Sequence, residues 1–329
     1  MSEAIKKILV TGGAGYIGSV LIARLLLEGY QVRTIDNLNF GGRSLLGFWV
    51  HPDFEFQYGD IRSNQDVGKA LEGIQAVVHL AAIVGDKACH QEPDLAIDVN
   101  LRASRLLCEA ALHHKVKRFV FASTCSNYGT TGGDDTLVDE TSPLNPISLY
   151  AELKVDFEKQ LLNLDHPDFT PVCLRFATAY GLSPRPRFDL TVNEFTRDLS
   201  LGKKLEVYGQ QFYRPYCHVV DLARACILAL EADSSVVARQ AFNAGDTREN
   251  YRKKDIVELL TDRLPQQRDK ISYVHRDDDP RDYRVNCDKI KTKLDFSISK
   301  KVPDGIEEIL AAIASGLIDD PDSPRYRNA

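Results

Sequence analysis

A tyrosine and a lysine four residues apart, Tyr150 and Lys154, form the pair in this chain whose spacing most directly suggests chemistry. Positions i and i+4 of a helix lie on one face, so the lysine ammonium can lie beside the tyrosine phenol. A neighbouring cation favours the phenolate, which lowers the pKa of the tyrosine and makes it a usable base near neutral pH. Because the chain holds 13 tyrosines, such a pair also arises by chance, and its place in the fold has to support it.

A hydroxyl group is predicted to meet this pair. The apolar run 118–122 is typical of a strand and ends in Ser123 and Thr124, ahead of the helix that carries the tyrosine. In an open parallel sheet, ligands bind at the carboxyl ends of the strands. We therefore expect a hydroxyl from this strand end to lie beside Tyr150.

Three glycines near the N-terminus suggest a phosphate site. Gly12, Gly15 and Gly18 follow an apolar strand-like run and precede a helical pattern that includes Ile17 and Val20. A helix N-terminus presents free N–H groups and a positive dipole end, and glycines let the backbone approach an anion closely. A strand, a glycine turn and a helix in this order predict a site for a dinucleotide pyrophosphate.

A carboxylate stands at the expected distance from this turn. Asp36 ends the strand-like run 31–36, 21 residues after Gly15. It can accept both hydroxyls of an adenosine ribose and would repel a 2′-phosphate, which favours NAD as the cofactor. Two alternatives stay open, because Asp36 could be an ordinary turn residue, and because Arg33 and Arg43 are near enough for NADP.

Alternating strand and helix patterns predict the fold. Their order favours a Rossmann-type α/β fold, a doubly wound parallel sheet. We expect strands near 7–11, 31–36, 54–58, 76–80, 117–122 and 170–175, and helices near 15–28, 63–72, 93–114 and 147–164. Beyond about residue 180 the pattern loosens and prolines are frequent, which indicates a smaller C-terminal α/β substrate-binding lobe.

The same patterns predict how the chain is divided. We expect an NAD-binding domain over 1–180, with returning segments from about 215–245, and a lobe made mainly of 181–318. Residues 319–329 are polar, and their composition favours a disordered tail.

Composition excludes several classes of function. The net charge of −6 provides no basic surface for nucleic acid. No apolar run is long enough to cross a membrane, and the first residues lack the apolar core of a signal peptide. The seven cysteines are odd in number and form no Cys-x-x-Cys pair. We therefore expect a cytoplasmic protein with reduced thiols, no metal, no nucleic-acid partner and no membrane segment.

A set of short motifs runs in order along nearly the whole chain. They are Thr11–Gly18, Asp36-Asn37, Gly59–Ile61, His79–Ala82, Asn100, Ser123–Gly129, Tyr150-x-x-x-Lys154, Arg175–Gly181, Arg214–Asp221 and Arg281–Arg284. With these residues the chain resembles the extended short-chain dehydrogenase/reductase family. Within that family it is most similar to the NAD-dependent nucleotide-sugar epimerases and dehydratases, in the branch that resembles UDP-glucose 4-epimerase.

The resemblance implies a set of cofactor-binding residues. The pyrophosphate would be held by Gly12, Gly15, Tyr16, Ile17 and Gly18, the adenosine end by Asp36, Asn37, Asp60 and Ile61, and the rest of NAD by Ala81, Ala82, Asn100, Tyr150 and Lys154. Tyr150 would act as the base, Thr124 would share the hydrogen bond of the sugar hydroxyl, and Lys154 would also bind the nicotinamide ribose.

The resemblance also implies a nucleotide-diphosphate sugar as substrate. Arg214 and Arg281 would clamp the diphosphate, as guanidinium forks suit it. Further substrate contacts would come from Thr178, Asn193, Ser126 and His90. Thr178 departs from the family, in which asparagine is usual at this position, so the sugar or its pose can differ. A surface or packing role is the alternative for His90 and Asn193.

The residues after Thr124 bear on the type of reaction. Dehydratases of this family carry Asp-Glu there, whereas this chain has Cys125 and Ser126, which disfavours dehydration. The leading hypothesis is therefore an epimerase that passes through a 4-keto sugar. Three alternative functions stay open. The protein could be a 4-ketosugar reductase or a non-catalytic NAD-sensing protein, and a dehydratase is a less favoured alternative. Cys125 is either an acid/base or a buried thiol.

A homodimer is expected as well. Apolar residues recur along the predicted helices 93–114 and 147–164, and paired helices could form a four-helix interface, as in similar proteins. These residues are Leu101, Leu107, Ala111, Val155, Leu161 and Leu162.

Overall fold

Seven parallel strands form the central sheet of the computed structural model, which describes residues 5–130, 136–274 and 282–328. Their order is β11-β7-β5-β4-β1-β2-β3. The strands are β1 (Lys7–Thr11), β2 (Gln31–Asp36), β3 (Phe54–Tyr58), β4 (Ala76–His79), β5 (Arg118–Thr124), β7 (Thr170–Phe176) and β11 (Gln240–Ala244). The six strands expected from the sequence are confirmed. The chain winds outward in opposite directions from β1 and β4, so the switch point where ligands bind in such sheets lies between these two strands.

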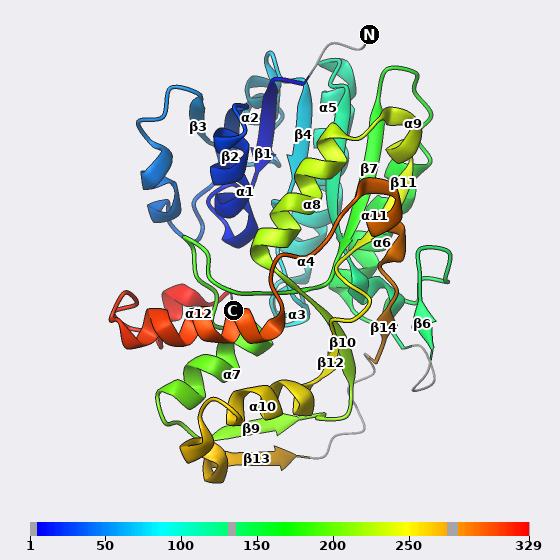
Figure 1. Cartoon of the computed structure of the whole chain (residues 1–329). Coiled ribbons are helices and arrows are strands. Elements are labelled where there is room, and N and C mark those ends of the chain that lie inside the picture. The colour runs from blue at the N-terminus through cyan, green and yellow to red at the C-terminus, as the bar shows by residue number, and fades with distance from the viewer. Residues whose placement is uncertain (1–4, 131–135, 275–281, 329) are drawn as a thin grey trace.

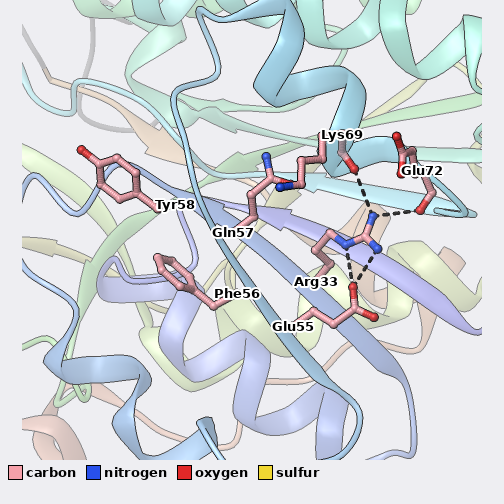
Figure 2. A pocket seen from close by; sticks show the side chains of 7 residues that line it. All are labelled: Arg33, Glu55, Phe56, Gln57, Tyr58, Lys69 and Glu72. Atoms are coloured by element: carbon pink, nitrogen blue, oxygen red, sulfur yellow. Dashed lines mark hydrogen bonds and ion pairs between the residues drawn. The ribbon is translucent and has the colours of Figure 1, made fainter.

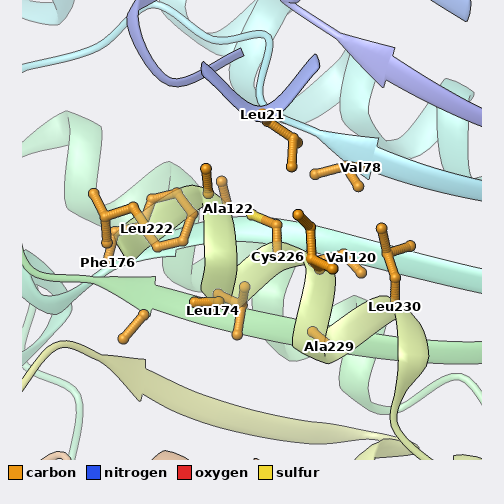
Figure 3. Close-up of a cluster of buried hydrophobic side chains, with 14 of the residues drawn as sticks. Leu21, Val78, Val120, Ala122, Leu174, Phe176, Leu222, Cys226, Ala229 and Leu230 are labelled. Carbon is orange, nitrogen blue, oxygen red and sulfur yellow. The ribbon is translucent and has the colours of Figure 1, made fainter. Parts of the chain in front are cut away.

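Helices cover both faces of the sheet (Figure 1). On one face lie α1 (Tyr16–Leu27), α8 (Val219–Glu231) and α11 (Asp288–Leu294), and on the other lie α2 (Asn64–Leu71), α5 (Ala103–His113) and α6 (Leu149–Leu162). Figure 3 shows part of the first layer, with Leu21 of α1 beside Val78 of β4, and Cys226 of α8 near Val120 of β5. Burial on both faces explains why the central strands β1, β4, β5 and β7 are mostly apolar, whereas the edge strand β3 keeps exposed positions. The Rossmann-type α/β fold is confirmed.

The helix expected over 93–114 is divided into three. A short α4 (Pro93–Ile97) leads into a π-helical turn, η2 (Asp98–Arg102), and then into α5. The buried Asn100 lies in this turn, and its side chain pairs with both backbone groups of Ile83, accepting from the N–H and donating to the carbonyl, each at 2.8 Å. Such turns occur often at functional sites. Here the turn places an amide against the segment that follows β4.

The smaller lobe is built from short elements at the carboxyl side of the sheet (Figure 1). Its strands are β8 (Thr178–Tyr180), β10 (Tyr213–His218), β12 (Asn250–Arg252), β9 (Leu205–Tyr208) and β13 (Ile271–Val274), and its helices are α7 (Thr191–Ser200), α10 (Lys253–Thr261) and α12 (Val302–Ala314). Two paired strands and two short helices complete the strands and α-helices of the described residues. They are the strands β6 (Leu137–Val138) and β14 (Arg284–Val285) and the helices α3 (Asp86–Gln91) and α9 (Ser234–Val237). Tyr216 and the three lobe helices share one hydrophobic cluster.

Two later segments return to the sheet. One contributes α8 and β11, within the range expected to return. The other contributes α11, whose Ile290 and Leu294 belong to the hydrophobic cluster of the sheet. Residues 285–296 therefore pack with the dinucleotide-type domain, although the sequence pattern places them within the lobe.

The polar C-terminal segment is ordered rather than a free tail. A short 3-10 turn, η5 (Pro324–Tyr326), packs its tyrosine ring edge-on against Phe188, with ring centroids 5.6 Å apart. The backbone N–H of Phe188 donates to the Tyr326 carbonyl at 2.8 Å. Composition misses these contacts because they depend on residues far away in the sequence.

The apolar stripe that suggested a dimer is largely used inside the chain. Leu107, Ala111 and Leu161 belong to the cluster beneath α5 and α6, and Val155 is buried as well. Only Leu101 and Leu162 of that set keep part of their surface exposed. All seven cysteines are buried and unpaired, as expected for reduced thiols. None of the helices in the described part of the chain has the length and apolar character needed to cross a bilayer.

Candidate active site

Helix α6 carries Tyr150 and Lys154 next to strand β5. Its N-cap, Ser148, accepts from the Ala151 N–H and donates to the Asp86 carboxylate at 2.6 Å, which secures the start of the helix. The Lys154 side chain is only 3% exposed. Its ammonium donates to the Ala122 carbonyl at 2.8 Å. This bond ties the helix to the strand two residues before Thr124.

The charge on this pair differs from the expectation. The Lys154 ammonium lies 5.9 Å from the centre of the Tyr150 ring and 4.7 Å from that of Phe121. Burial lowers the pKa of Lys154 to about 8. Burial also raises the pKa of Tyr150 above its ordinary value. The sequence predicts a pKa lowered by the lysine, whereas in the structure burial, with the Cys89 and Asp86 side chains, raises the pKa of Tyr150.

Thr124 ends β5 and begins the 3-10 turn η3 (Cys125–Tyr128). Its hydroxyl oxygen accepts from the Ser126 N–H at 3.1 Å and so caps this turn. The Ser126 hydroxyl lies 3.2 Å from the Tyr283 hydroxyl. Thr124 and Ser126 thus lie at the carboxyl end of β5, the strand to which Lys154 of α6 is bonded.

Cys125 points elsewhere. Its side chain is 1% exposed, and its thiol donates to the Arg175 carbonyl on β7 at 3.2 Å. Burial raises the pKa of this thiol well above its ordinary value. The acid/base alternative for Cys125 is not supported, because a buried thiol bonded to a neighbouring strand neither ionises readily nor reaches a substrate.

A buried ion pair that the sequence reading missed supports this strand end. Glu158 lies one turn after Lys154 and accepts from the Arg175 guanidinium through Nε at 2.9 Å and Nη2 at 2.6 Å. Its other oxygen accepts from the Ser123 hydroxyl at 2.5 Å and from the Asn127 amide at 3.3 Å. The spacing Tyr150, Lys154, Glu158 was the available signal, since all three lie on one helix face.

The glycine turn fits a pyrophosphate. Gly12 has φ +74°, and a Cβ there would lie 2.8 Å from the Ala81 nitrogen, while a Cβ at Gly18 would lie 2.3 Å from the Gly12 carbonyl oxygen. The N-cap of α1 is Gly15, which provides no side-chain cap. The first N–H groups of α1, from Tyr16 onward, are therefore left for an anion.

Asp36 is held at the end of β2. Its carboxylate accepts from the Ala14 N–H at 2.9 Å and from the Leu38 N–H at 2.8 Å. Burial raises the pKa of this carboxyl, and the two backbone donors oppose the rise. Nearby, the Asn37 amide donates to Asp60 at 3.3 Å, next to the buried Ile61. This group lies where the sequence predicts the adenosine end of the site.

Arg33 does not support the NADP alternative. Its guanidinium donates to Glu55 at 2.7 Å and to the carbonyls of Lys69, Ala70 and Glu72 at the end of α2 (Figure 2). Arg33 and Glu55 line a surface pocket beside the edge strand β3. Arg43 is exposed at the start of η1 (Arg43–Phe48).

A directed chain of hydrogen bonds joins β1, β4 and the π-helical turn. The Ser104 hydroxyl donates to the Asn100 carbonyl at 2.9 Å, so its oxygen must accept from His79 Nε2, 2.9 Å away. His79 Nδ1 then accepts from the Thr11 hydroxyl at 2.8 Å, whose oxygen accepts from the Ala81 N–H at 3.2 Å. Burial lowers the pKa of His79 to about 3, so the ring stays neutral. These hydrogen bonds hold the backbone of Ala81 in place. The Asn100 side chain holds Ile83 and thereby the segment that contains Ala82.

Asn193 is part of the framework instead of an exposed substrate contact. It is buried, and its amide donates to the carbonyls of Gly181 and Arg187 at 3.1 and 2.9 Å, while its oxygen accepts from the Gly181 N–H at 2.8 Å. The Tyr16 hydroxyl also donates to the Gly181 carbonyl, at 2.7 Å. A substrate contact by the Asn193 side chain is therefore not supported, because each polar atom is already bonded.

The remaining predicted substrate residues lie on several elements, and Arg214 shares its neighbour Tyr283 with Ser126. Arg214 on β10 has its guanidinium 5.1 Å from the centre of the Tyr283 ring, and Thr178 is half-buried on β8 opposite Tyr216. His90 is exposed at the end of α3. Arg281 lies outside the described residues. Within the described ranges no cluster of three metal-ligating side chains occurs.

Comparison with known proteins gives concordant matches. A family model described as the NAD dependent epimerase/dehydratase family matches residues 8–245. A UDP-glucose 4-epimerase of Halalkalibacterium halodurans is 31% identical over 272 residues, which cover 77% of this chain and 78% of that protein. The structure of a Thermotoga maritima UDP-glucose 4-epimerase with UDP-glucose has a TM-score of 0.83 at 26% identity and covers 94% of this chain and 99% of that one. A Thermus thermophilus UDP-glucose 4-epimerase in complex with NAD has a TM-score of 0.79 at 26% identity, with 94% and 99% covered.

Proposed function

The chain belongs to the NAD dependent epimerase/dehydratase family, and from that premise we propose that it is an NAD-dependent epimerase of a nucleotide-diphosphate sugar. Tyr150 removes the proton from a sugar hydroxyl, Thr124 shares the hydrogen bond to that hydroxyl, and Lys154 supplies positive charge beside them. The sugar passes through a transient 4-keto form. Bound NAD supplies the acceptor and donor of hydride.

The observation that carries this proposal is the attachment of α6 to β5. The Lys154 ammonium is bonded to the Ala122 carbonyl, and Tyr150 stands one helical turn earlier, toward the strand end where Thr124 lies. Ligands of open parallel sheets bind at this edge. A phenol, a hydroxyl and an ammonium are thus available for one proton transfer.

The charge of the site supports NAD over NADP. The uncapped N-terminus of α1 suits the pyrophosphate, through the N–H groups of Tyr16, Ile17 and Gly18. The Asp36 carboxylate would accept the ribose hydroxyls and repel a 2′-phosphate. Arg33, which could have compensated that repulsion, is engaged by Glu55.

The residues after Thr124 support epimerisation over dehydration. Neither Cys125 nor Ser126 is a carboxylic acid, and the Cys125 thiol is directed toward β7. Elimination of water beside a ketone needs an acid/base pair, which this turn does not provide. Since the relatives are named UDP-glucose 4-epimerases, a UDP-hexose is the first substrate to test, with Arg214, Arg281 and Thr178 proposed to bind it.

Assembly and location complete the proposal. We propose a homodimer through α5 and α6, now supported by the half-buried Leu101 and Leu162 rather than by the whole stripe. Light scattering at micromolar concentration tests it. The seven reduced cysteines support a cytoplasmic location.

The experiment that tests the function follows the epimer directly. The protein loaded with NAD is incubated in deuterated water with UDP-, GDP-, CDP- and dTDP-hexoses. The epimers are separated by chromatography, and mass spectrometry then measures their deuterium content. We expect conversion of one sugar into its 4-epimer without net production of reduced nicotinamide. Stoichiometric consumption of NADH would instead assign a ketosugar reductase, and solvent deuterium in the product would indicate enolisation beside C4.

The matched variants are Tyr150→Phe and Tyr58→Phe. Loss of the Tyr150 hydroxyl is expected to reduce turnover about 10²- to 10⁴-fold, with NAD binding retained. Tyr58 is an exposed tyrosine on the edge strand, and its variant is expected to behave as wild type. Undiminished turnover by Tyr150→Phe would refute the proposed base.

A further inference from the structure

One arginine is buried beside the proposed dinucleotide site without an ion-pair partner. Arg185 is 7% exposed, and its Nε atom has no hydrogen-bond acceptor. Among the described residues no carboxylate pairs with its guanidinium, whereas the neighbouring Arg187 and Arg197 pair with Asp189 and Asp198. A buried cation is costly unless an anion compensates it. The charge of Arg185 is therefore uncompensated and suits an anionic ligand.

The surroundings of Arg185 are those of the dinucleotide site. Its guanidinium stacks on the Phe40 ring, 4.2 Å from the ring centre, in the loop that follows Asp36. Its positive charge acts on the Asp36 carboxylate. Its backbone N–H donates to the Ser183 hydroxyl oxygen at 3.2 Å, and that hydroxyl donates to the Tyr16 carbonyl, in the first turn of α1, at 2.6 Å. Arg185 is thus linked to both predicted halves of the adenosine diphosphate site.

The C-terminal residues hold this side chain. Arg185 Nη1 donates to the Asn328 side-chain oxygen at 2.6 Å, and Nη2 donates to the Arg327 carbonyl at 3.1 Å. The Asn328 N–H in turn donates to Asp189 at 3.1 Å. Both acceptors are neutral, so they orient the guanidinium without cancelling its charge.

We propose that Arg185 is a further dinucleotide-binding residue, whose guanidinium neutralises the pyrophosphate, and that Arg327 and Asn328 position it. The inference rests on the proposed function. An arginine fork suits a diphosphate because it offers parallel N–H donors with a fixed charge. The C-terminal segment then has a role in cofactor retention that its polar composition does not suggest.

Two diphosphates could use this cation, that of the cofactor and that of the sugar nucleotide. ADP-ribose and UDP separate them, since each carries one of the two. Binding of NAD, ADP-ribose and UDP is measured by calorimetry for the wild type, Arg185→Met, Arg185→Lys and a chain that ends at Tyr326. Arg325→Met is the matched control, because Arg325 is exposed in the same segment and pairs with Asp319.

We expect Arg185→Met to weaken NAD and ADP-ribose binding about 10- to 100-fold, the value of a lost charge-assisted hydrogen bond. The shortened chain should bind NAD and ADP-ribose about 3- to 10-fold more weakly. UDP binding should be unchanged in both variants, and Arg325→Met should bind all three ligands like the wild type. Melting without ligand checks folding, and Arg185→Lys, which keeps the charge, remains informative if the methionine variant does not fold.

Unaltered ADP-ribose binding by folded Arg185→Met, or by the shortened chain if that variant does not fold, overturns the assignment, as does a loss confined to UDP. Either result leaves the epimerase proposal intact. A wild type that binds neither NAD nor ADP-ribose overturns the proposed function and this inference together.

Discussion

Glu158→Gln is the substitution whose consequence the structure defines best. The Glu158 and Arg175 side chains are 1% and 5% exposed, so neither charge is compensated by water. One carboxylate oxygen accepts two bonds from Arg175, and the other accepts from Ser123 and Asn127. Glutamine has one acceptor oxygen and no charge, so four donors compete for it and the buried guanidinium loses its counter-ion.

Removing one partner of a buried ion pair costs about 3–5 kcal/mol. For a chain of 329 residues each kcal/mol corresponds to roughly 1.5 °C, so the melting temperature should fall by about 4–8 °C. The control is Glu152→Gln, an exposed acid on the same helix, which should change stability by less than about 0.5 kcal/mol. Unfolding is followed by circular dichroism at pH 7.

The same variant tests the positioning of the strand end. Because Ser123 precedes Thr124, a loosened Ser123 should lower kcat about tenfold or more and leave KM for the sugar within about twofold. The double variant Glu158→Gln/Arg175→Met should recover part of the lost stability, since it no longer buries an unpaired charge. If Glu158→Gln melted like Glu152→Gln, the buried pair would not support this end of the sheet.

Three further outcomes follow from the buried groups. Because the pKa of Lys154 falls from its ordinary 10.5 to about 8, the unfolded chain binds more protons between these values and wild-type stability rises with pH there. Lys154→Met should therefore be inactive, yet more stable than wild type at pH 7 by at most about 3 kcal/mol. In denaturant titrations this gain in the free energy of unfolding should shrink between pH 8 and 10.5. A variant less stable than wild type at pH 7 would contradict this expectation. Cys125→Ala should keep kcat within about twofold and lose about 1 kcal/mol, whereas a hundredfold loss of turnover would restore the thiol as an acid/base. The ¹⁵N spectrum of His79 should show a neutral ring protonated on Nε2 and unchanged from pH 5 to 8, because its pKa is about 3; titration in that range would show that the hydrogen-bond chain is wrong.

The sequence pattern located the sheet and identified the residues proposed for both halves of the site. The central strands are buried on both faces and are therefore largely apolar runs, which identifies them without tertiary information, whereas β3 at the edge keeps exposed residues such as Tyr58. The glycine turn and Asp36 were predictable because their spacing reflects one strand, one helix and the next strand. The same holds for Tyr150 and Lys154, which one helix turn brings together.

Other positions stayed open in the sequence because their residue types suit two environments. Asn193 and Cys125 have the chemistry of site residues, but their neighbours in space, Gly181 and Arg175, engage them inside the framework. The stripe through Leu107 and Leu161 has the same periodicity whether it faces a partner or the chain's own sheet. The π-helical turn at Asn100 differs from an α-helix by one residue per turn, which hydrophobic periodicity does not resolve.

Local order along the chain thus determined the fold class, the dinucleotide turn and the reactive pair, because each depends on residues close in sequence. Only the tertiary structure decided the lowered pKa of Lys154, the pairing of Glu158 with Arg175, and the contact of Arg185 with the C-terminal residues. These depend on burial and on partners up to 143 positions apart. Desolvation and long-range hydrogen bonds exist only once the chain has folded, so no spacing in the sequence encodes them directly.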